Sequence, residues 1–158
     1  MIEIKNKAEC CGCYACFQIC PVDAIKMIPD AEGFSYPKVD IQRCINCGKC
    51  EKICPEFMPE STLPVIKTYA AYRKNFEKRL KSSSGGIFTV LAEFVLRKNG
   101  VVFGAAFDKD WRLKHCAVHS IDELPNLQGS KYLQSAIGTA FQDVEKYLES
   151  GKIVLFSG

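Results

Sequence analysis

The chain has 158 residues, of which 47% are hydrophobic and 25% charged, with a formal net charge of +3. This composition indicates a globular protein with material for one large domain or two small ones. Charges of both signs are mixed along the chain, which argues against a nucleic-acid-binding stripe. Apolar stretches are too short to span a membrane, and the first residues lack the apolar core of a signal peptide. We therefore expect a cytoplasmic protein with no nucleic-acid partner and no membrane insertion.

Eight of the ten cysteines form two copies of one motif, C-x2-C-x2-C-x3-C-P, spaced 34 residues apart. The first copy is Cys10, Cys13, Cys16 and Cys20, and the second is Cys44, Cys47, Cys50 and Cys54. This is the ligand pattern of bacterial two-cluster ferredoxins, in which the fourth cysteine of each run binds the other cluster. We therefore predict two [4Fe–4S] clusters and single-electron transfer. The predicted ligand sets are Cys10, Cys13, Cys16 and Cys54 for cluster 1, and Cys44, Cys47, Cys50 and Cys20 for cluster 2.

The spacing of the cysteines has a physical reason. Two-residue gaps let a tight loop bring three thiolates to three corners of a cubane, and the proline after the fourth cysteine turns the chain away without needing an amide partner. Zinc is a weaker interpretation, because paired C-x2-C motifs leave the third cysteine and the proline unexplained. Disulfides need an oxidising compartment. Of the remaining cysteines, Cys11 is predicted to be a spare thiol and Cys116 a small core residue.

The character of the sequence changes at residues 59–66, where two prolines and no hydrophobic periodicity predict a linker. Residues 1–58 before it are predicted to form an α+β ferredoxin-type two-cluster domain. Its one hairpin should pair residues 24–28 with residues 34–39 around the turn at 30–33. Such a domain has little apolar core, so we expect the clusters themselves to hold it together.

Residues 67–158 have the pattern of an incomplete α/β domain. The predicted strands cover residues 68–72, 101–107, 111–119 and 153–156, and the longer predicted helices cover residues 87–97 and 136–149. Ser120 and Glu123 form a predicted capping box before a short helix, and Ser135 is predicted to cap the last helix. The sheet is unfinished at Gly158, where an α/β protein would place a binding loop, so we expect the sequence to be part of a longer one.

Three further segments are specific enough to indicate a family. They are K-S-S-S-G-G-I-F-T at residues 81–89, G-S-K-Y-L-Q-S at 129–135 and V-L-F-S-G at 154–158. Together with the two cysteine runs, they resemble the N-terminal part of the coenzyme F420 hydrogenase/dehydrogenase beta subunit family. The resemblance implies an iron–sulfur flavoprotein that passes electrons between clusters, FAD and a hydride-accepting coenzyme. Coenzyme F420 is then a candidate substrate, and FAD a cofactor of the full-length protein.

A serine- and glycine-rich segment stands directly before the predicted helix at residues 87–97. Its amides and hydroxyls could hold an anion such as the pyrophosphate of FAD, with Lys81 neutralising charge. The alternative is an ordinary serine N-cap with glycines for close packing, and the sequence leaves both open. The resemblance alone adds Lys131 as a phosphate contact and Tyr132 as a ring-stacking residue. The candidate flavin-binding residues are Ser83, Ser84, Gly85, Gly86 and Lys131.

We expect an iron–sulfur electron-transfer protein that forms the ferredoxin module and electron-entry part of an FAD-dependent oxidoreductase. Its partner would be a redox protein or a soluble electron carrier. The alternative is a non-enzymatic ferredoxin-like carrier whose α/β extension docks a partner enzyme. In a third hypothesis the clusters only brace the fold. The sequence contains no recognisable acid–base pair or activated nucleophile, so no catalytic residue is predicted.

Overall fold

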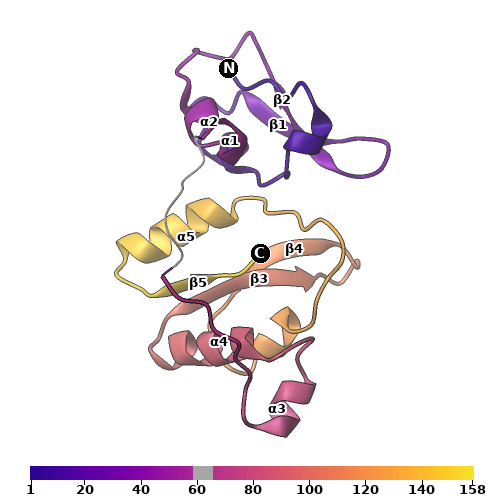
Figure 1. The fold of residues 1–158 in the computed structure, drawn as a ribbon. Coiled ribbons are helices and arrows are strands. Elements are labelled where there is room, and N and C mark those ends of the chain that lie inside the picture. The colour runs from indigo at the N-terminus through magenta and orange to yellow at the C-terminus, as the bar shows by residue number, and fades with distance from the viewer. Residues whose placement is uncertain (59–65) are drawn as a thin grey trace. The chain divides into compact units, whose positions relative to one another are not determined.

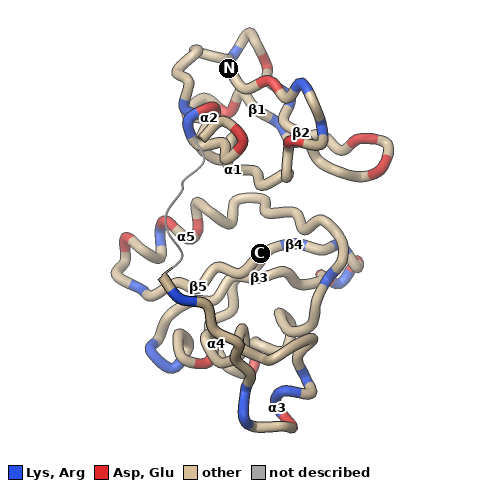
Figure 2. The backbone as a smooth tube through the Cα atoms, in the orientation of Figure 1, with Lys and Arg blue, Asp and Glu red and all other residues tan. Residues whose placement is uncertain are grey.

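A computed structural model describes residues 1–58 and 66–158 (Figure 1). The chain divides into two compact units, Met1–Leu63 and Pro64–Gly158. Residues 59–65 of the predicted linker lie outside the described residues. Lys and Arg are interspersed with Asp and Glu along both units (Figure 2). Among the described residues, no helix has the length and apolar character needed to cross a membrane.

The first unit is built from short elements. They are η1 (Lys7–Glu9), α1 (Ala15–Gln18), β1 (Ile25–Pro29), β2 (Ser35–Val39), α2 (Lys49–Lys52) and η2 (Pro55–Phe57), where η marks a 3-10 helix. Strands β1 and β2 pair antiparallel with Ile25 opposite Val39, which confirms the predicted hairpin. Its turn is held by Asp30, whose carboxylate accepts hydrogen bonds from the backbone N–H groups of Glu32 and Phe34.

The two cysteine runs repeat the same backbone path. Helices α1 and α2 occupy equivalent positions, and each follows a residue in the left-handed region: Tyr14 at φ 63° and Gly48 at φ 71°. Two residues earlier, Gly12 and Asn46 are left-handed as well, at φ 62° and 55°. Glycine adopts this conformation freely and asparagine tolerates it, but a bulky side chain does not. Of these four residues, only Tyr14 has a bulky side chain, so the backbone strain falls on Tyr14.

The second unit is a small mixed sheet with helices on both faces (Figure 1). Its elements are α3 (Phe76–Leu80), α4 (Ile87–Arg97), β3 (Val101–Phe107), β4 (Leu113–Val118), η3 (Leu124–Leu127), α5 (Ala140–Glu149) and β5 (Val154–Phe156). The strand order is β4-β3-β5, with β3 antiparallel to β4 and parallel to β5. The unit is therefore mixed α/β.

Alternate residues of β3 enter two separate apolar clusters. Val102 and Ala106 pack against α4 and η3, while Val101 and Phe103 pack against α5. Because both faces of β3 are covered, the prediction of a doubly buried strand at residues 101–107 is confirmed.

Helix α4 has the predicted bounds. Its C-terminus closes through Asn99, which is left-handed at φ 58°, and through a 3.0 Å hydrogen bond from the Gly100 N–H to the Val95 carbonyl. One face of α4 packs on the sheet, as its apolar composition predicts. The opposite face keeps apolar side chains exposed, namely Ile87, Val90, Leu91 and Phe94.

Three predicted elements differ from the structure. The prediction of a strand at residues 68–72 is wrong, because this segment has no regular structure. The last helix begins at Ala140 instead of 136, because Ala136 forms a parallel bridge with Lys114 in β4. Glu123 does accept a hydrogen bond from the Ser120 N–H at 3.0 Å, but the helix that follows is the 3-10 helix η3.

Candidate functional sites

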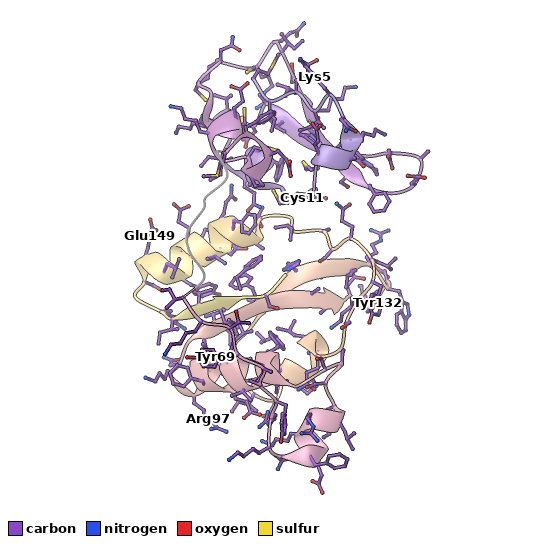
Figure 3. All side chains as sticks on the ribbon, viewed as in Figure 1. Lys5, Cys11, Tyr69, Arg97, Tyr132 and Glu149 are labelled. Atoms are coloured by element: carbon purple, nitrogen blue, oxygen red, sulfur yellow. The ribbon has the colours of Figure 1, made fainter. Side chains whose placement is uncertain are left out.

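The first unit contains a small cavity walled by thiols from both cysteine runs. Its cysteines are Cys10, Cys13 and Cys16 of the first run, Cys54 of the second, and Cys11. Apolar side chains complete the wall, among them Ile2, Ile4 and Met27. Cys11 is exposed on the loop that carries the first run (Figure 3).

A second small cavity has the reciprocal composition. Its cysteines are Cys44, Cys47 and Cys50 of the second run and Cys20 of the first. The fourth cysteine of each run thus lies with the first three of the other run. This is the arrangement that the predicted crossed ligand sets require, since each predicted set of four lines a cavity of its own, which Cys11 joins at the first.

Three thiols of the first cavity, those of Cys10, Cys13 and Cys16, lie in an environment that disfavours charge when no metal is bound. Burial raises the pKa of Cys16 to about 12, and it also raises the pKa of Cys10 and of Cys13. Backbone N–H groups oppose this effect, as the N–H of Gly12 does for Cys10. Metal binding requires thiolates, so cluster insertion must displace these protons.

The spread of the thiols bears on which metal group fits. In the described part of the chain, no three side chains of His, Cys, Asp or Glu converge closely enough to hold one metal ion. A cubane spaces its thiolates more widely, because each thiolate binds a different iron atom. Each cavity gathers the four thiols of one predicted ligand set, which matches the four iron corners of a cubane.

A larger cavity, of about 500 Å³, lies in the second unit. All the candidate flavin-binding residues line it: Ser83, Ser84, Gly85, Gly86 and Lys131. They come from two segments of the chain, and the C-terminal end of β5 adds Ser157. Helix α4 begins at Ile87, so the N–H groups of its first turn, which have no partner within the helix, lie at the same wall. Cavities of this size are typical of cofactor sites.

The serine–glycine loop is packed tightly against the preceding segment. A side chain at Gly85 would place its Cβ 2.8 Å from the Ala71 carbonyl oxygen. The Gly85 carbonyl accepts a 2.7 Å hydrogen bond from the Arg73 N–H, and Gly86 is left-handed at φ 77°. The glycines therefore serve close packing, one of the two roles that the sequence left open. The other role, anion binding, stays a prediction.

The segment at residues 129–135 ties the cavity wall together. The Ser130 N–H donates a 2.6 Å hydrogen bond to the Ser83 hydroxyl oxygen. The Lys131 ammonium donates to the Gln128 carbonyl at 2.8 Å, and burial lowers the pKa of Lys131. Tyr132 is 92% exposed, points away from the sheet in Figure 3 and does not line the cavity. Its predicted stacking role is therefore not supported, and neither is charge neutralisation by Lys81, which also lies outside the lining.

His115 was not predicted to belong to this site. Its ring stacks on Phe156 with centroids 5.1 Å apart and 7° between planes. Its Nε2 lies 3.0 Å from the Ser157 carbonyl oxygen, which can only accept, so Nε2 carries the proton and Nδ1 accepts from the Ser135 hydroxyl at 2.9 Å. Burial lowers the pKa of His115. The neutral ring thus fixes Ser157 at the cavity wall.

Gly104 also lines the cavity and was missed. A Cβ at this position would lie 3.3 Å from the Leu127 side chain. The available signal was a glycine in the middle of a buried strand, which marks a place where another group approaches the backbone closely.

Comparison with known proteins connects the two units to known families. Residues 9–58 match the model of the 4Fe-4S dicluster domain. Residues 68–142 match that of the N-terminal part of the coenzyme F420 hydrogenase/dehydrogenase beta subunit. The second unit thus resembles the N-terminal part of this beta subunit family, and the first unit resembles a two-cluster ferredoxin. With its dicluster domain, the chain is an iron–sulfur protein with an electron-transfer role.

Individual relatives match different parts of the chain. One of the subunits of the F(420)H(2) dehydrogenase of Methanosarcina mazei is 26% identical across 92% of the chain, which covers 45% of that protein. One of the subunits of the Na(+)-translocating ferredoxin:NAD(+) oxidoreductase complex of Acetobacterium woodii is 36% identical over 44% of the chain and 19% of its own length. A ferredoxin of Alicyclobacillus acidocaldarius is 34% identical over 38% of the chain and 80% of its own length. The chain thus spans less than half of the first two relatives.

Proposed function

We propose that the first unit holds two [4Fe–4S] clusters on crossed ligand sets and passes single electrons. Cluster 1 would bind Cys10, Cys13, Cys16 and Cys54, and cluster 2 would bind Cys44, Cys47, Cys50 and Cys20. The observation that supports this proposal is the composition of the two cavities, each lined by the first three ligand cysteines of one run and the fourth of the other, with Cys11 in addition at the first cavity. Hydrogen bonds to sulfur are part of the fit: the Ala24 N–H donates to the Cys20 Sγ at 3.3 Å.

The second unit would bind FAD in the cavity of about 500 Å³. The amides of Ser84 to Gly86, together with the first turn of α4, provide donors for the pyrophosphate. Lys131 supplies a positive charge at the same cavity. When bound, a flavin converts single electrons into hydride, which cysteine-held clusters cannot do alone. The residues of the chain bind and orient the cofactor, and we assign none of them to proton transfer.

Together the two units would form the electron-entry part of an FAD-dependent oxidoreductase. Electrons would pass between a redox partner protein or soluble carrier, the clusters and the flavin. A hydride-accepting coenzyme would then be the two-electron substrate, with coenzyme F420 as the first candidate because residues 68–142 match the family model named for this coenzyme. The observation that carries this proposal is that the predicted flavin residues, separated in the sequence, line one cavity.

A second candidate function is that of a non-enzymatic electron carrier. The ferredoxin of Alicyclobacillus acidocaldarius supports it, since the match covers 80% of that protein. In this case the second unit would dock a partner enzyme instead of binding FAD.

Metal and flavin content separate these functions. After anaerobic reconstitution we expect about eight iron and eight sulfide per chain, and a count near one or two metals, or zinc, would refute the cluster proposal. We expect the full-length protein to purify with FAD, and Gly85→Val to lower its FAD content without changing its iron content. Tyr132→Ala, exposed and outside the cavity, is the matched control and should change neither. A full-length protein with eight iron and no flavin would favour the carrier function.

A further inference from the structure

The strained backbone at Tyr14 distinguishes the two cysteine loops. Tyr14 and Gly48 occupy the same position of the repeat, and both precede a one-turn helix with nearly the same dihedrals, φ 63° ψ 3° and φ 71° ψ 0°. Glycine accepts this conformation without strain, whereas a tyrosine Cβ crowds its own backbone. The difference in residue type therefore puts a large side chain at a strained position in one loop only.

The Tyr14 side chain forms part of the wall of the first cavity. Its ring packs edge-on against Phe17, with centroids 6.1 Å apart and 87° between planes. Two of the thiols at this cavity, those of Cys16 and Cys54, belong to residues only 7% and 9% exposed. An aromatic residue and two buried thiols thus share the wall of the first cavity.

At the second cavity the residue equivalent to Tyr14 is a glycine. Gly48 at its wall has no side chain, and its neighbours Asn46 and Lys49 are polar and charged. Cys47 at this cavity is exposed. Both cavities are otherwise lined mainly by apolar residues, so the difference lies in the charges and in the burial of the thiols. Lys49 lies at the second cavity and Glu56 at the first, and only the first has buried cysteines, Cys16 and Cys54.

We infer that Tyr14 shields cluster 1 from water and makes it the harder of the two clusters to reduce. This inference rests on the proposed ligand sets. Reduction by one electron adds a negative charge to a group that already carries about −2, and an apolar, buried environment disfavours added charge. An exposed site beside Lys49 favours it. An electron entering the first unit therefore rests on cluster 2, and cluster 1 is the stronger reductant.

A redox titration of the reconstituted protein, followed by electron paramagnetic resonance, tests this inference. The unchanged protein should show two one-electron steps. Tyr14→Gly gives the first loop the residue of the second, and should shift the lower step to higher potential while the upper step stays in place. Tyr14→Asn, which tolerates the left-handed region, should give the same shift. Tyr14→Phe keeps the ring and should leave both steps unchanged.

Iron release to a chelator gives a second readout. We expect a fast phase from cluster 2 and a slow phase from cluster 1, with Tyr14→Gly and Tyr14→Asn accelerating only the slow phase. If both variants keep about eight iron and neither the lower step nor the slow phase moves, the inference about Tyr14 is wrong while the cluster proposal stands. If the unchanged protein itself binds no clusters, the proposed function fails first, and the inference fails with it.

Discussion

Replacing Arg73 with methionine should destabilise the second unit more than any other change to the ion pairs around Glu93. Glu93 lies 2.9 Å from Arg73, 3.4 Å from Lys78 and 3.2 Å from Arg97. The side chains of Glu93 and Arg73 are 10% and 11% exposed, whereas those of Lys78 and Arg97 are 51% and 64% exposed. Three cations thus share one carboxylate, but only one of them is buried with it.

The expected losses follow from burial. Breaking a buried ion pair costs about 3–5 kcal/mol, and an exposed pair contributes about 0.2–1 kcal/mol. One guanidinium nitrogen of Arg73, Nη1, is buried without a hydrogen-bond partner, so removing Arg73 also removes an unfavourable burial. We therefore expect Arg73→Met to cost about 3 kcal/mol, at the low end of the buried range. Lys78→Met and Arg97→Met should each cost less than about 1 kcal/mol.

Urea unfolding followed by circular dichroism measures these differences, and pH supplies an internal check. Burial alone would raise the pKa of Glu93, but the hydrogen bond and charge of Arg73, with those of Lys78, hold this pKa below its ordinary value. A carboxylate with a lowered folded-state pKa stabilises the fold above the unfolded-state pKa of about 4.3, and this stabilisation is lost as the pH falls through the folded-state value. The loss of unfolding free energy caused by Glu93→Gln should therefore be largest at neutral pH and should shrink below about pH 4. Equal losses for Arg73→Met and Arg97→Met, or a deficit independent of pH, would refute the reasoning.

Three further predictions concern single positions. Cys54→Ala should remove the cluster of the first cavity and Cys20→Ala that of the second, so paramagnetic resonance should find different surviving clusters; loss of the cluster of the mutated run would contradict the crossed sets. Cys11→Ser should keep about eight iron per chain, and a count near four would make Cys11 a ligand. Gly100→Ala should destabilise the second unit by about 3 kcal/mol in thermal unfolding, because its Cβ would lie 2.5 Å from the Ile153 carbonyl oxygen; a change below about 0.5 kcal/mol would mean that the strand can shift aside.

The elements that the sequence predicted well are those determined by local patterns. Helix α4 combines an apolar stripe with a left-handed Asn99 and a following glycine, and β3 is a continuous apolar run, so both have the predicted bounds. The hairpin of the first unit is specified by a turn whose aspartate binds its own backbone. The cysteine spacing likewise predicted the four thiols that gather around each cavity, but not that Cys11 would line the first one as well, and their role as ligands stays a prediction.

The errors arose where a contact distant in sequence decides local structure. The helix predicted from residue 136 starts at Ala140, because the residues before it pair with β4 and place Ser135 against His115. Residues 68–72 have the composition of a strand. The chain directly after them is instead held by Arg73, whose backbone N–H binds the serine–glycine loop and whose side chain pairs with Glu93. Neither contact leaves a periodic signal in the sequence.

The reciprocal sharing of thiols has a consequence for how the first unit assembles. A fragment that ends anywhere between Cys20 and Cys44 contains three thiols of one cavity and one of the other, and so completes neither. Chain synthesis must pass Cys50 before the second cavity has all four of its thiols, and Cys54 before the first does. With the proposed ligand sets, neither cluster could be completed until the second cysteine run has been synthesised, so the first run would wait for it without a complete cluster.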